Sequence, residues 1–270
     1  MQQIKASLLI STYNWPQALD LVFRSLLVQT KMPLEIVIAD DGSKPETGNL
    51  IDSYRNRFPF PIKHIWQEDK GFRKTGIMNQ SVSKIEGDYI IQIDGDIILH
   101  PRFIEDHLNQ AQDGFFIKGS RGMLSQQKSE EILRTKCIQI STFDKGLNSK
   151  INGTRFTLAS RFFYGDPKKT NDLRGCNFAF WKKDFIAVNG YNNSLTGWGH
   201  EDIELAARMV NSLVKRKQLK MSAVCYHLYH KLNTRQNQNM NHNIYMDAVK
   251  SGTIRCLNGF DQSDSLESKD

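Results

Sequence analysis

The segment Gly87-Asp88-Tyr89-Ile90-Ile91-Gln92-Ile93-Asp94-Gly95-Asp96 joins a short apolar run to two carboxylates. The apolar part, Tyr89 to Ile93, has the length of a buried strand. A strand that is buried on both faces is typical of a parallel sheet, which binds its ligands at the carboxyl ends of its strands. Asp94 and Asp96 at such an edge can hold a hard divalent cation, and the cation can neutralise a phosphate-bearing ligand. The alternative is an ordinary turn in which Asp and Gly have their usual conformational roles.

Strand-like and helix-like segments alternate before this segment. Two of the strands end in the polar turns Ser11-Thr12-Tyr13-Asn14 and Asp40-Asp41-Gly42-Ser43, which should converge beside Asp94 and Asp96. The pattern predicts an α/β fold with a mostly parallel, nucleotide-binding sheet flanked by helices. The expected strands are Ala6 to Ile10, Leu34 to Ala39, Ile62 to Gln67 and the run up to Asp94, and the expected helices begin at Trp15-Pro16, after Ser43 and within Gly71 to Lys84.

The second half of the chain is harder to interpret. Residues 119–172 form a polar stretch with an aromatic patch at Phe162-Phe163-Tyr164, and they are either a solvated insertion or an acceptor-side flap or membrane-facing surface. We expect one domain over residues 1–257: a nucleotide-binding half at about 1–118, this variable insertion, and an acceptor-side extension at 173–240. The tail after Asn241, and above all 258–270, is polar and predicted to be mobile.

Composition restricts the partners. The 270 residues are 39% hydrophobic and 24% charged, as in an ordinary soluble protein, and the four cysteines form no CxxC pair. The net charge of +7 predicts an anionic partner: nucleic acid, a membrane surface or a phosphorylated substrate. The scattered basic residues match no nucleic-acid module, so we expect no nucleic acid. Without a secretory signal or a membrane-length apolar run, the predicted location is cytoplasmic, with peripheral attachment to an anionic membrane.

Two later motifs can contribute to a site. Gly197-Trp198-Gly199-His200-Glu201-Asp202 precedes a predicted helix from Asp202 to Val214, and its acids are either capping residues at a helix N-terminus or functional groups. His227 and His230 follow the last predicted strand, Met221 to Tyr226. A lone histidine at a strand end is more often structural, and we give that role to the other five, except that His200 lies within the motif.

These motifs resemble those of the family-2 inverting glycosyltransferases of GT-A fold. The second half is similar to the galactosyltransferase-type carboxyl module of chondroitin polymerases, β-1,4-galactosyltransferases and polypeptide N-acetylgalactosaminyltransferases. The resemblance covers roughly residues 4–230, and its motifs occur in the family's order: Ser11-Thr12-Tyr13-Asn14, Asp40-Asp41-Gly42-Ser43, Gly71-Phe72-Arg73 through Asn79, Asp94-Gly95-Asp96 and Gly197-Trp198-Gly199-His200-Glu201-Asp202.

The resemblance implies a metal-dependent, inverting enzyme. It would move a hexose or N-acetylhexosamine from a UDP-sugar to a glycan or lipid-linked acceptor, in surface polysaccharide synthesis. A sugar hydroxyl needs a carboxylate to take its proton, and Mn²⁺ or Mg²⁺ would offset the charge of the departing diphosphate.

The resemblance also implies a role for each residue of the motifs. Asp202 would be the catalytic base, and Asp96 would ligate the metal with His227, which matches the family's pattern better than His230 does. Asp94 would contact the ribose and the metal's shell. Asp40 would contact the nucleotide's base, which is expected to be uracil. The residues that would bind the donor are Thr12, Tyr13, Asn14, Asp40, Arg73, Asn79, Asp94 and Gly95. Those that would line the acceptor or sugar pocket are Trp198, Gly199 and Glu201.

Two alternatives differ in class. A sugar-nucleotide pyrophosphorylase shares the sheet and the metal, but it normally has a glycine-rich phosphate loop after the first strand, and Ser11 to Trp15 contains no glycine. A non-catalytic carbohydrate- or membrane-binding module on the same scaffold would have a broken site, whereas both acidic clusters are intact here.

Overall fold

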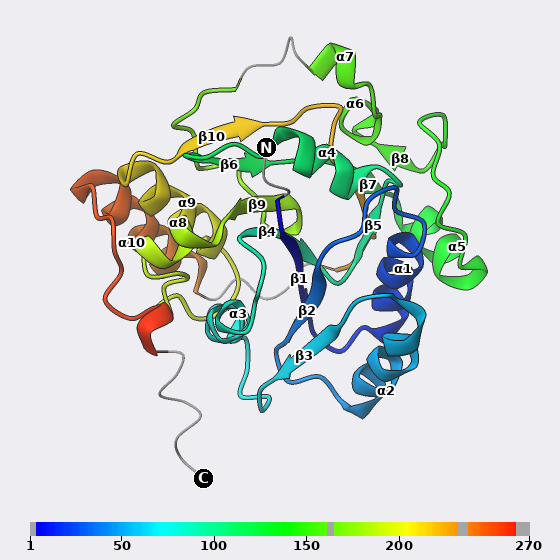
Figure 1. Ribbon diagram of the computed structural model, residues 1–270, viewed down its shortest axis with the longest axis horizontal. Helices are drawn as coiled ribbons and strands as arrows, with labels where there is room; N and C mark the ends of the chain where they lie inside the picture. Colours follow the sequence, from blue (N-terminus) through cyan, green and yellow to red (C-terminus); the bar gives the residue numbers. More distant parts are fainter. Residues whose placement is uncertain (1–3, 161–164, 232–236, 263–270) are drawn as a thin grey trace.

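A seven-stranded sheet forms the centre of the chain in a computed structural model that describes residues 4–160, 165–231 and 237–262. Its strands are β1 (Ala6–Thr12), β2 (Glu35–Asp40), β3 (Ile62–Trp66), β4 (Tyr89–Asp94), β6 (Phe115–Lys118), β9 (Phe178–Trp181) and β10 (Lys215–Gln218). They lie in the order β10-β6-β9-β4-β1-β2-β3 (Figure 1). All pairs are parallel except those of β9, which runs antiparallel to both β4 and β6. The predicted mostly parallel sheet is therefore confirmed.

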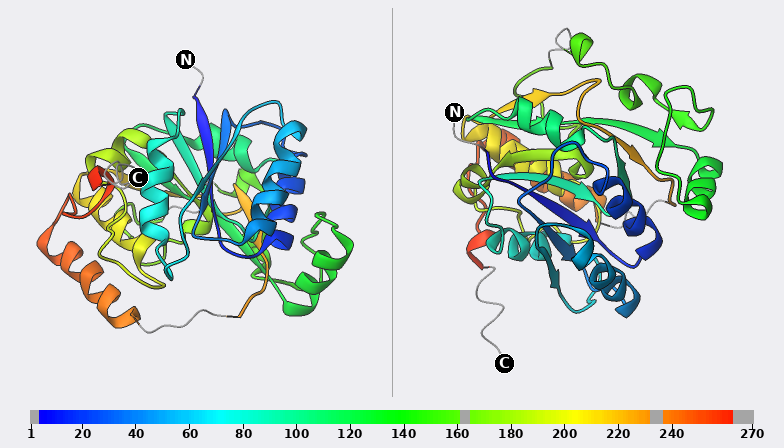
Figure 2. Two further views of the ribbon diagram at one scale, coloured as in Figure 1. Left: turned by 90° about the horizontal axis from the view of Figure 1, so that it is seen from below. Right: turned by 45° about the vertical axis from the view of Figure 1, so that its right-hand side comes forward.

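Helices cover both faces of this sheet, which explains why the strands are continuous apolar runs. On one face, Leu8 and Ile10 pack against α1 (Pro16–Leu26), α2 (Pro45–Tyr54) and α4 (Phe103–Gln110). On the other, Leu9 and Val37 pack against α3 (Lys74–Ser83), α8 (Lys182–Ala187) and α9 (Glu201–Asn211). The left view of Figure 2 shows α1 and α2 in blue on one side of the sheet, with α3 and α9 in cyan and yellow on the other. Within the described ranges, no helix is long and apolar enough to cross a membrane.

A second, four-stranded sheet joins the insertion to the core. It has the order β5-β11-β7-β8, with β5 (Ile97–Leu99), β7 (Ser120–Leu124), β8 (Leu147–Asn148) and β11 (Val224–His227). β11 pairs with β5, the strand that directly follows Asp96, and the Leu228 N–H donates to the Asp96 carbonyl oxygen at 3.1 Å. The end of the last strand is thereby held against the acidic turn. The remaining elements are η1 (Arg55–Arg57), α5 (Gln126–Thr135), α6 (Lys150–Gly153), α7 (Thr157–Ser160), η2 (Gly175–Asn177), α10 (Gln238–Ser251) and η3 (Phe260–Gln262).

Residues 119–172 are thus partly integral to the fold, because β7 and β8 belong to this sheet. The same stretch contains the helix α5, which has the N-cap Ser125. The aromatic patch Phe162-Phe163-Tyr164 lies outside the described residues, so its expected role stays a prediction.

Residues 241–262, part of the tail predicted to be mobile, include most of α10 and all of η3 in the structure. Asn241 of α10 is fully buried, and its amide donates to the carbonyl oxygens of Thr196 and Gly199 at 3.1 and 3.0 Å. Phe260 packs edge-on against Phe185 at a ring-centroid distance of 5.9 Å. The polar composition concealed this helix, because its buried positions at helical spacing (Asn241, Tyr245 and Ala248) include an asparagine. The rest of the predicted tail, 263–270, lies outside the described residues.

Candidate active site

The acidic turn after β4 is fixed against the end of β1. The Gly95 N–H donates to the Ser11 carbonyl oxygen at 2.7 Å, and a Cβ at position 95 would lie 2.9 Å from the Thr12 hydroxyl. Only glycine fits so close an approach. Asp94 Oδ1 accepts a hydrogen bond from Ser11 Oγ at 2.7 Å and forms an ion pair with Lys74 Nζ at 2.9 Å. The first carboxylate of the turn therefore faces β1 and α3.

The second acidic cluster begins α9 and reaches the same lysine. Glu201 Oε1 lies 4.0 Å from Lys74 Nζ, so Lys74 bridges carboxylates that are far apart in the sequence. Asp202 is held by two donors, the Gly175 N–H at 2.7 Å and the Tyr191 hydroxyl at 3.0 Å. These contacts orient the carboxylate of the predicted base. Lys74 was not among the predicted site residues, although it directly follows Arg73 in the loop motif.

Charge is balanced around Lys74. Burial disfavours its ammonium charge, but the carboxylates of Asp94, Asp202 and Glu201 outweigh this effect and raise the pKa of Lys74 above its usual value. Burial would likewise raise the pKa of Asp94, yet Lys74 and Ser11 stabilise its charged form, and the net shift is downward. Lys74 and Asp94 thus form a charged pair at neutral pH.

The pKa of Glu201 is shifted in the opposite direction to that of Asp94. Burial, followed by the charge of Asp202, raises the pKa of Glu201 to about 7. Its Oε2 accepts a hydrogen bond from the Gly199 N–H at 3.0 Å, and only 6% of the residue is exposed. Glu201 therefore takes up a proton close to neutral pH, while it lies beside the residue predicted to be the base.

We expect Glu201→Gln to make the metal-free protein more stable at alkaline pH. Because the folded-state pKa lies above the ordinary value of 4.5, the folded state binds more protons between pH 4.5 and about 7, and stability falls as pH rises through this window. The wild type should lose about 1–3 kcal/mol of unfolding free energy there, and the variant should not. Denaturant unfolding in EDTA at pH 5 and pH 8 measures the difference. Glu130→Gln, an exposed site on α5, is the matched control, and an unchanged pH dependence in Glu201→Gln would contradict the assignment.

Asp96 and two histidines form a separate cluster. Asp96 Oδ2 lies 3.6 Å from His227 Nε2 and 3.4 Å from His230 Nε2. Asp96 Oδ1 and His227 Nδ1 are buried and have no hydrogen-bond partner among the described residues. Leaving buried polar atoms unpaired costs about 1–3 kcal/mol each, whereas carboxylate and imidazole groups that converge in this way suit a transition-metal cation.

This cluster sharpens the prediction of metal ligands. The sequence favoured His227 over His230, whereas the structure brings both to Asp96 at similar distances, with one candidate ligand atom from each residue. Asp94 points instead to Ser11 and Lys74. The three residues that could hold a divalent cation are therefore Asp96, His227 and His230.

The predicted donor turn after β1 is bonded to the turn after β2. The Asn14 N–H donates to Ser43 Oγ at 2.8 Å, and Asn14 Oδ1 accepts from the Lys44 N–H at 2.8 Å. Asn14 has a φ of 47°, which asparagine tolerates better than most residues. Tyr13 is half exposed and donates to Asp69 Oδ2 at 2.8 Å. Thr12 is buried, so Tyr13 is the most exposed side chain of this turn.

Asp40, which is predicted to contact the nucleotide's base, is buried in the structure. It is 1% exposed, accepts from the Ser43 N–H at 2.8 Å and pairs with His64 Nε2 at 2.9 Å, beside a cavity of about 220 Å³ next to α2. Successive side chains at a strand end point in opposite directions, so Asp41 faces the other way. Its carboxylate accepts from the Gln67 amide and from the Arg73 N–H. Asp41, not Asp40, faces the loop that carries Arg73.

Asn79, which is predicted to contact the donor, is fully buried. Its side chain donates to the Tyr191 carbonyl oxygen and accepts from the Tyr191 N–H, both at 2.8 Å. The Tyr191 hydroxyl in turn donates to Asp202, so Asn79 supports the candidate catalytic base through Tyr191. Around the partly buried Trp198, Gly197 and Gly199 have φ values of 71° and 109°, a conformation that favours glycine.

Comparison with known proteins identifies the family. A family model described as glycosyl transferase family 2 matches residues 7–180. The chain belongs to this family. A second model, described as the N-terminal domain of galactosyltransferase, matches residues 156–231. Both matches confirm the resemblance that the motifs of this family-2 chain suggested.

Relatives of this family-2 chain support the same fold. Chondroitin synthase from Pasteurella multocida is 24% identical over 224 residues, which are 77% of this chain, but the chain spans only 23% of that relative's length. The solved structure of a mannosyltransferase from Pyrobaculum calidifontis with GDP-Man and Mn²⁺ has a TM-score of 0.62 at 12% identity, over 94% of this chain and 65% of that one. The solved structure of GalNAc-T7 with UDP, GalNAc and Mn²⁺ has a TM-score of 0.64 at 15% identity, over 92% of this chain and 50% of that one. The architecture is the GT-A fold.

Proposed function

We propose that this protein is a metal-dependent, inverting glycosyltransferase that moves a hexose or N-acetylhexosamine from a UDP-sugar to a glycan or lipid-linked acceptor. The observation that carries the proposal is the meeting of Asp94-Gly95-Asp96 with Glu201-Asp202 and the two histidines across one sheet edge. A site that combines a candidate general base with candidate metal ligands suits sugar transfer from a nucleoside diphosphate.

The donor would lie along the edge formed by the turns after β1, β2 and β4. We assign Asp41 and the exposed ring of Tyr13 to binding of the nucleotide's base. Both contact the loop from Gln67 to Arg73: Asp41 accepts from Gln67 and Arg73, and Tyr13 donates to Asp69. Lys74 adds positive charge beside Asp94, where it can counter the diphosphate. The relatives that contain UDP or GDP-Man with Mn²⁺ support a nucleotide-sugar donor.

Asp202 would accept the proton of the attacking acceptor hydroxyl. The Gly175 N–H and the Tyr191 hydroxyl hold its carboxylate, so that it is oriented before the acceptor arrives. As the hydroxyl oxygen bonds to the anomeric carbon, the bond to the diphosphate breaks on the opposite face, and the configuration is inverted. Mn²⁺ or Mg²⁺, held by Asp96, His227 and His230, would supply Lewis-acid charge for the departing diphosphate.

A donor screen tests the proposal. Purified protein with UDP-Gal, UDP-GalNAc, UDP-Glc, UDP-GlcNAc and GDP-Man should release nucleoside diphosphate from one UDP-sugar, and only with Mn²⁺ or Mg²⁺ present. NMR of the product should show the anomer opposite to that of the donor. Retention of configuration, or turnover that persists in EDTA, would contradict the proposal. Pyrophosphate release from UTP and a sugar phosphate would instead identify a pyrophosphorylase.

The biological setting belongs to the same proposal. Surface polysaccharide synthesis agrees with the relationship to chondroitin synthase. The net charge of +7 supports peripheral attachment to an anionic membrane that holds a lipid-linked acceptor. A high-salt wash of membranes should release the protein if this attachment is electrostatic.

A further inference from the structure

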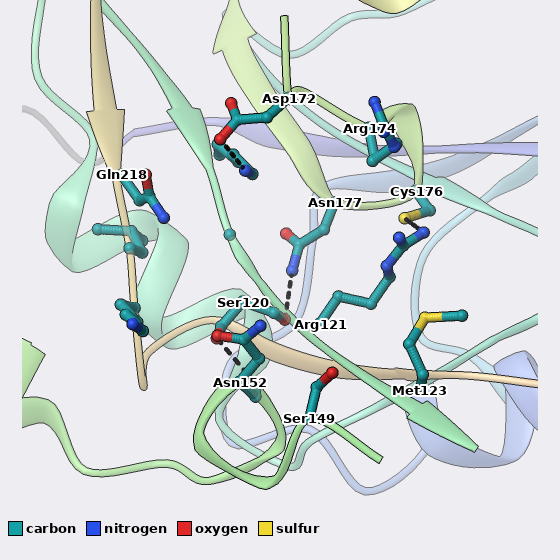
Figure 3. Close-up of a pocket in the computed structure, with 14 residues that line it drawn as sticks. Ser120, Arg121, Met123, Ser149, Asn152, Asp172, Arg174, Cys176, Asn177 and Gln218 are labelled. Carbon is teal, nitrogen blue, oxygen red and sulfur yellow. Dashed lines mark hydrogen bonds and ion pairs between the residues drawn. The ribbon is translucent and has the colours of Figure 1, made fainter. Parts of the chain in front are cut away.

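A cavity of about 240 Å³ lies between β7, η2 and the chain that leads from β10 to β11 (Figure 3). Arg174 and Cys176 line it on either side of Gly175, whose N–H holds Asp202. Met123, on the facing wall, is the neighbour of His227 in the pairing of β7 with β11. The cavity therefore adjoins both the candidate base and the candidate metal ligands. Because pockets for drug-sized ligands measure roughly 300–1,000 Å³, its size suits a single sugar ring.

The lining of this cavity is strongly basic. Lys118, Arg121 and Arg174 are basic residues of the described lining, and Asp172 is the acid among them. Asp172 is already shared, because its carboxylate lies 3.0 Å from Lys118 Nζ, 2.7 Å from an Arg216 nitrogen and 3.3 Å from Lys169 Nζ. Its negative charge is thus occupied by neighbours, and the cavity keeps an excess of positive charge.

Arg121 is a partly buried basic residue of this lining. Figure 3 shows its side chain running from β7 toward Cys176, whose Sγ accepts a hydrogen bond from it at 3.2 Å, with Arg174 close by. Burial raises the pKa of the Cys176 thiol to about 11, so this partner is neutral at pH 7. Neither Arg121 nor Arg174 forms an ion pair within residues 4–160, 165–231 and 237–262; Arg174 bonds only the Leu173 carbonyl oxygen. No carboxylate of the described residues pairs directly with the partly buried guanidinium of Arg121, and the charge of Asp94 acts on it only from a distance. Such a group is poorly compensated until an anion binds.

We propose that this cavity binds an acidic group on the acceptor, with Arg121 and Arg174 as its anion-binding residues, an inference that rests on the proposed function. The group is a carboxylate, as in a uronic acid, or a phosphate ester, since guanidinium groups bind both through paired N–H donors. An acceptor anchored there by its charge would place a hydroxyl of the same sugar ring toward Asp202, next to Gly175.

The test compares acceptors that differ only in charge. Methyl β-glucuronide should be used with a kcat/KM about 10- to 100-fold above that of methyl β-glucoside, the range expected for hydrogen bonds to a charged group. Glucose 6-phosphate, compared with glucose, forms the phosphate arm and identifies which anion is preferred. Equal use of the charged and neutral acceptors in both arms would overturn the proposal.

Two arginine variants extend the test. Arg174→Gln and Arg121→Gln should each lower the preference for the charged acceptor about tenfold or more. Because the Arg174 side chain is exposed, its replacement should not impair folding. Arg134→Gln, exposed on α5, makes the same charge change elsewhere and should keep the preference. A preference that survives both cavity variants would overturn the assignment of these arginines.

The same experiments separate this inference from the proposed function. If the wild type transfers sugar without preferring an acidic acceptor, the function stands and the inference fails. If no donor is turned over at all, calorimetry with methyl β-glucuronide still decides whether the cavity binds an anion: binding that Arg174→Gln abolishes supports the inference, and absence of binding overturns it.

Discussion

Asp202→Asn should lower the kcat of sugar transfer by about 10²- to 10⁴-fold, the usual contribution of a general base. The amide keeps the shape of the carboxylate but cannot take the acceptor proton, so donor binding should change little. Initial rates of UDP release and calorimetric titration with UDP and Mn²⁺ measure the two quantities separately. If Asp202→Asn transfers sugar as fast as the wild type, the base is another group.

Gly175→Ala should displace the Asp202 carboxylate without changing its chemistry. A Cβ at position 175 would lie 2.3 Å from Asp202 Oδ1, so the carboxylate must move, and a shift of about 1 Å can cost on the order of 10²-fold in rate. Gly48→Ala is the matched control within α2, where the nearest atom would be 3.9 Å away. This control should gain about 0.5–1 kcal/mol of stability and keep full activity.

Asp96→Asn should raise the Mn²⁺ concentration for half-maximal activity by more than about 100-fold, since changes in groups that only support metal ligands already cost about 10–100-fold. His227→Ala and His230→Ala should each weaken Mn²⁺ binding, because both Nε2 atoms lie within 3.6 Å of the same carboxylate oxygen. Electron paramagnetic resonance of free Mn²⁺ measures binding independently of turnover.

The histidine comparison has a matched control. His242→Ala removes an exposed imidazole on α10 and should leave Mn²⁺ binding unchanged. Unchanged Mn²⁺ affinity in His230→Ala would remove that residue from the site and restore the preference for His227 alone. Unchanged affinity in Asp96→Asn would remove the site itself.

The sequence by itself determined the local structure and the family. The apolar run from Tyr89 to Ile93, the Pro16 helix start and the polar strand ends report backbone geometry over a few residues, and all of them are confirmed. Parallel strands end at one edge, so the sequence also indicated which loops would meet there. The motif order predicted the GT-A fold because each motif is a local feature of that edge.

Only the tertiary structure decided which groups touch. The pairing of β11 with β5 brings both histidines to Asp96, and burial between two acidic clusters makes Lys74 their common partner. The direction of a side chain at a strand end separates Asp40 from Asp41, although their sequence context is the same. Such contacts join residues far apart along the chain, and their energies depend on burial and on neighbouring charges. No local periodicity records either quantity.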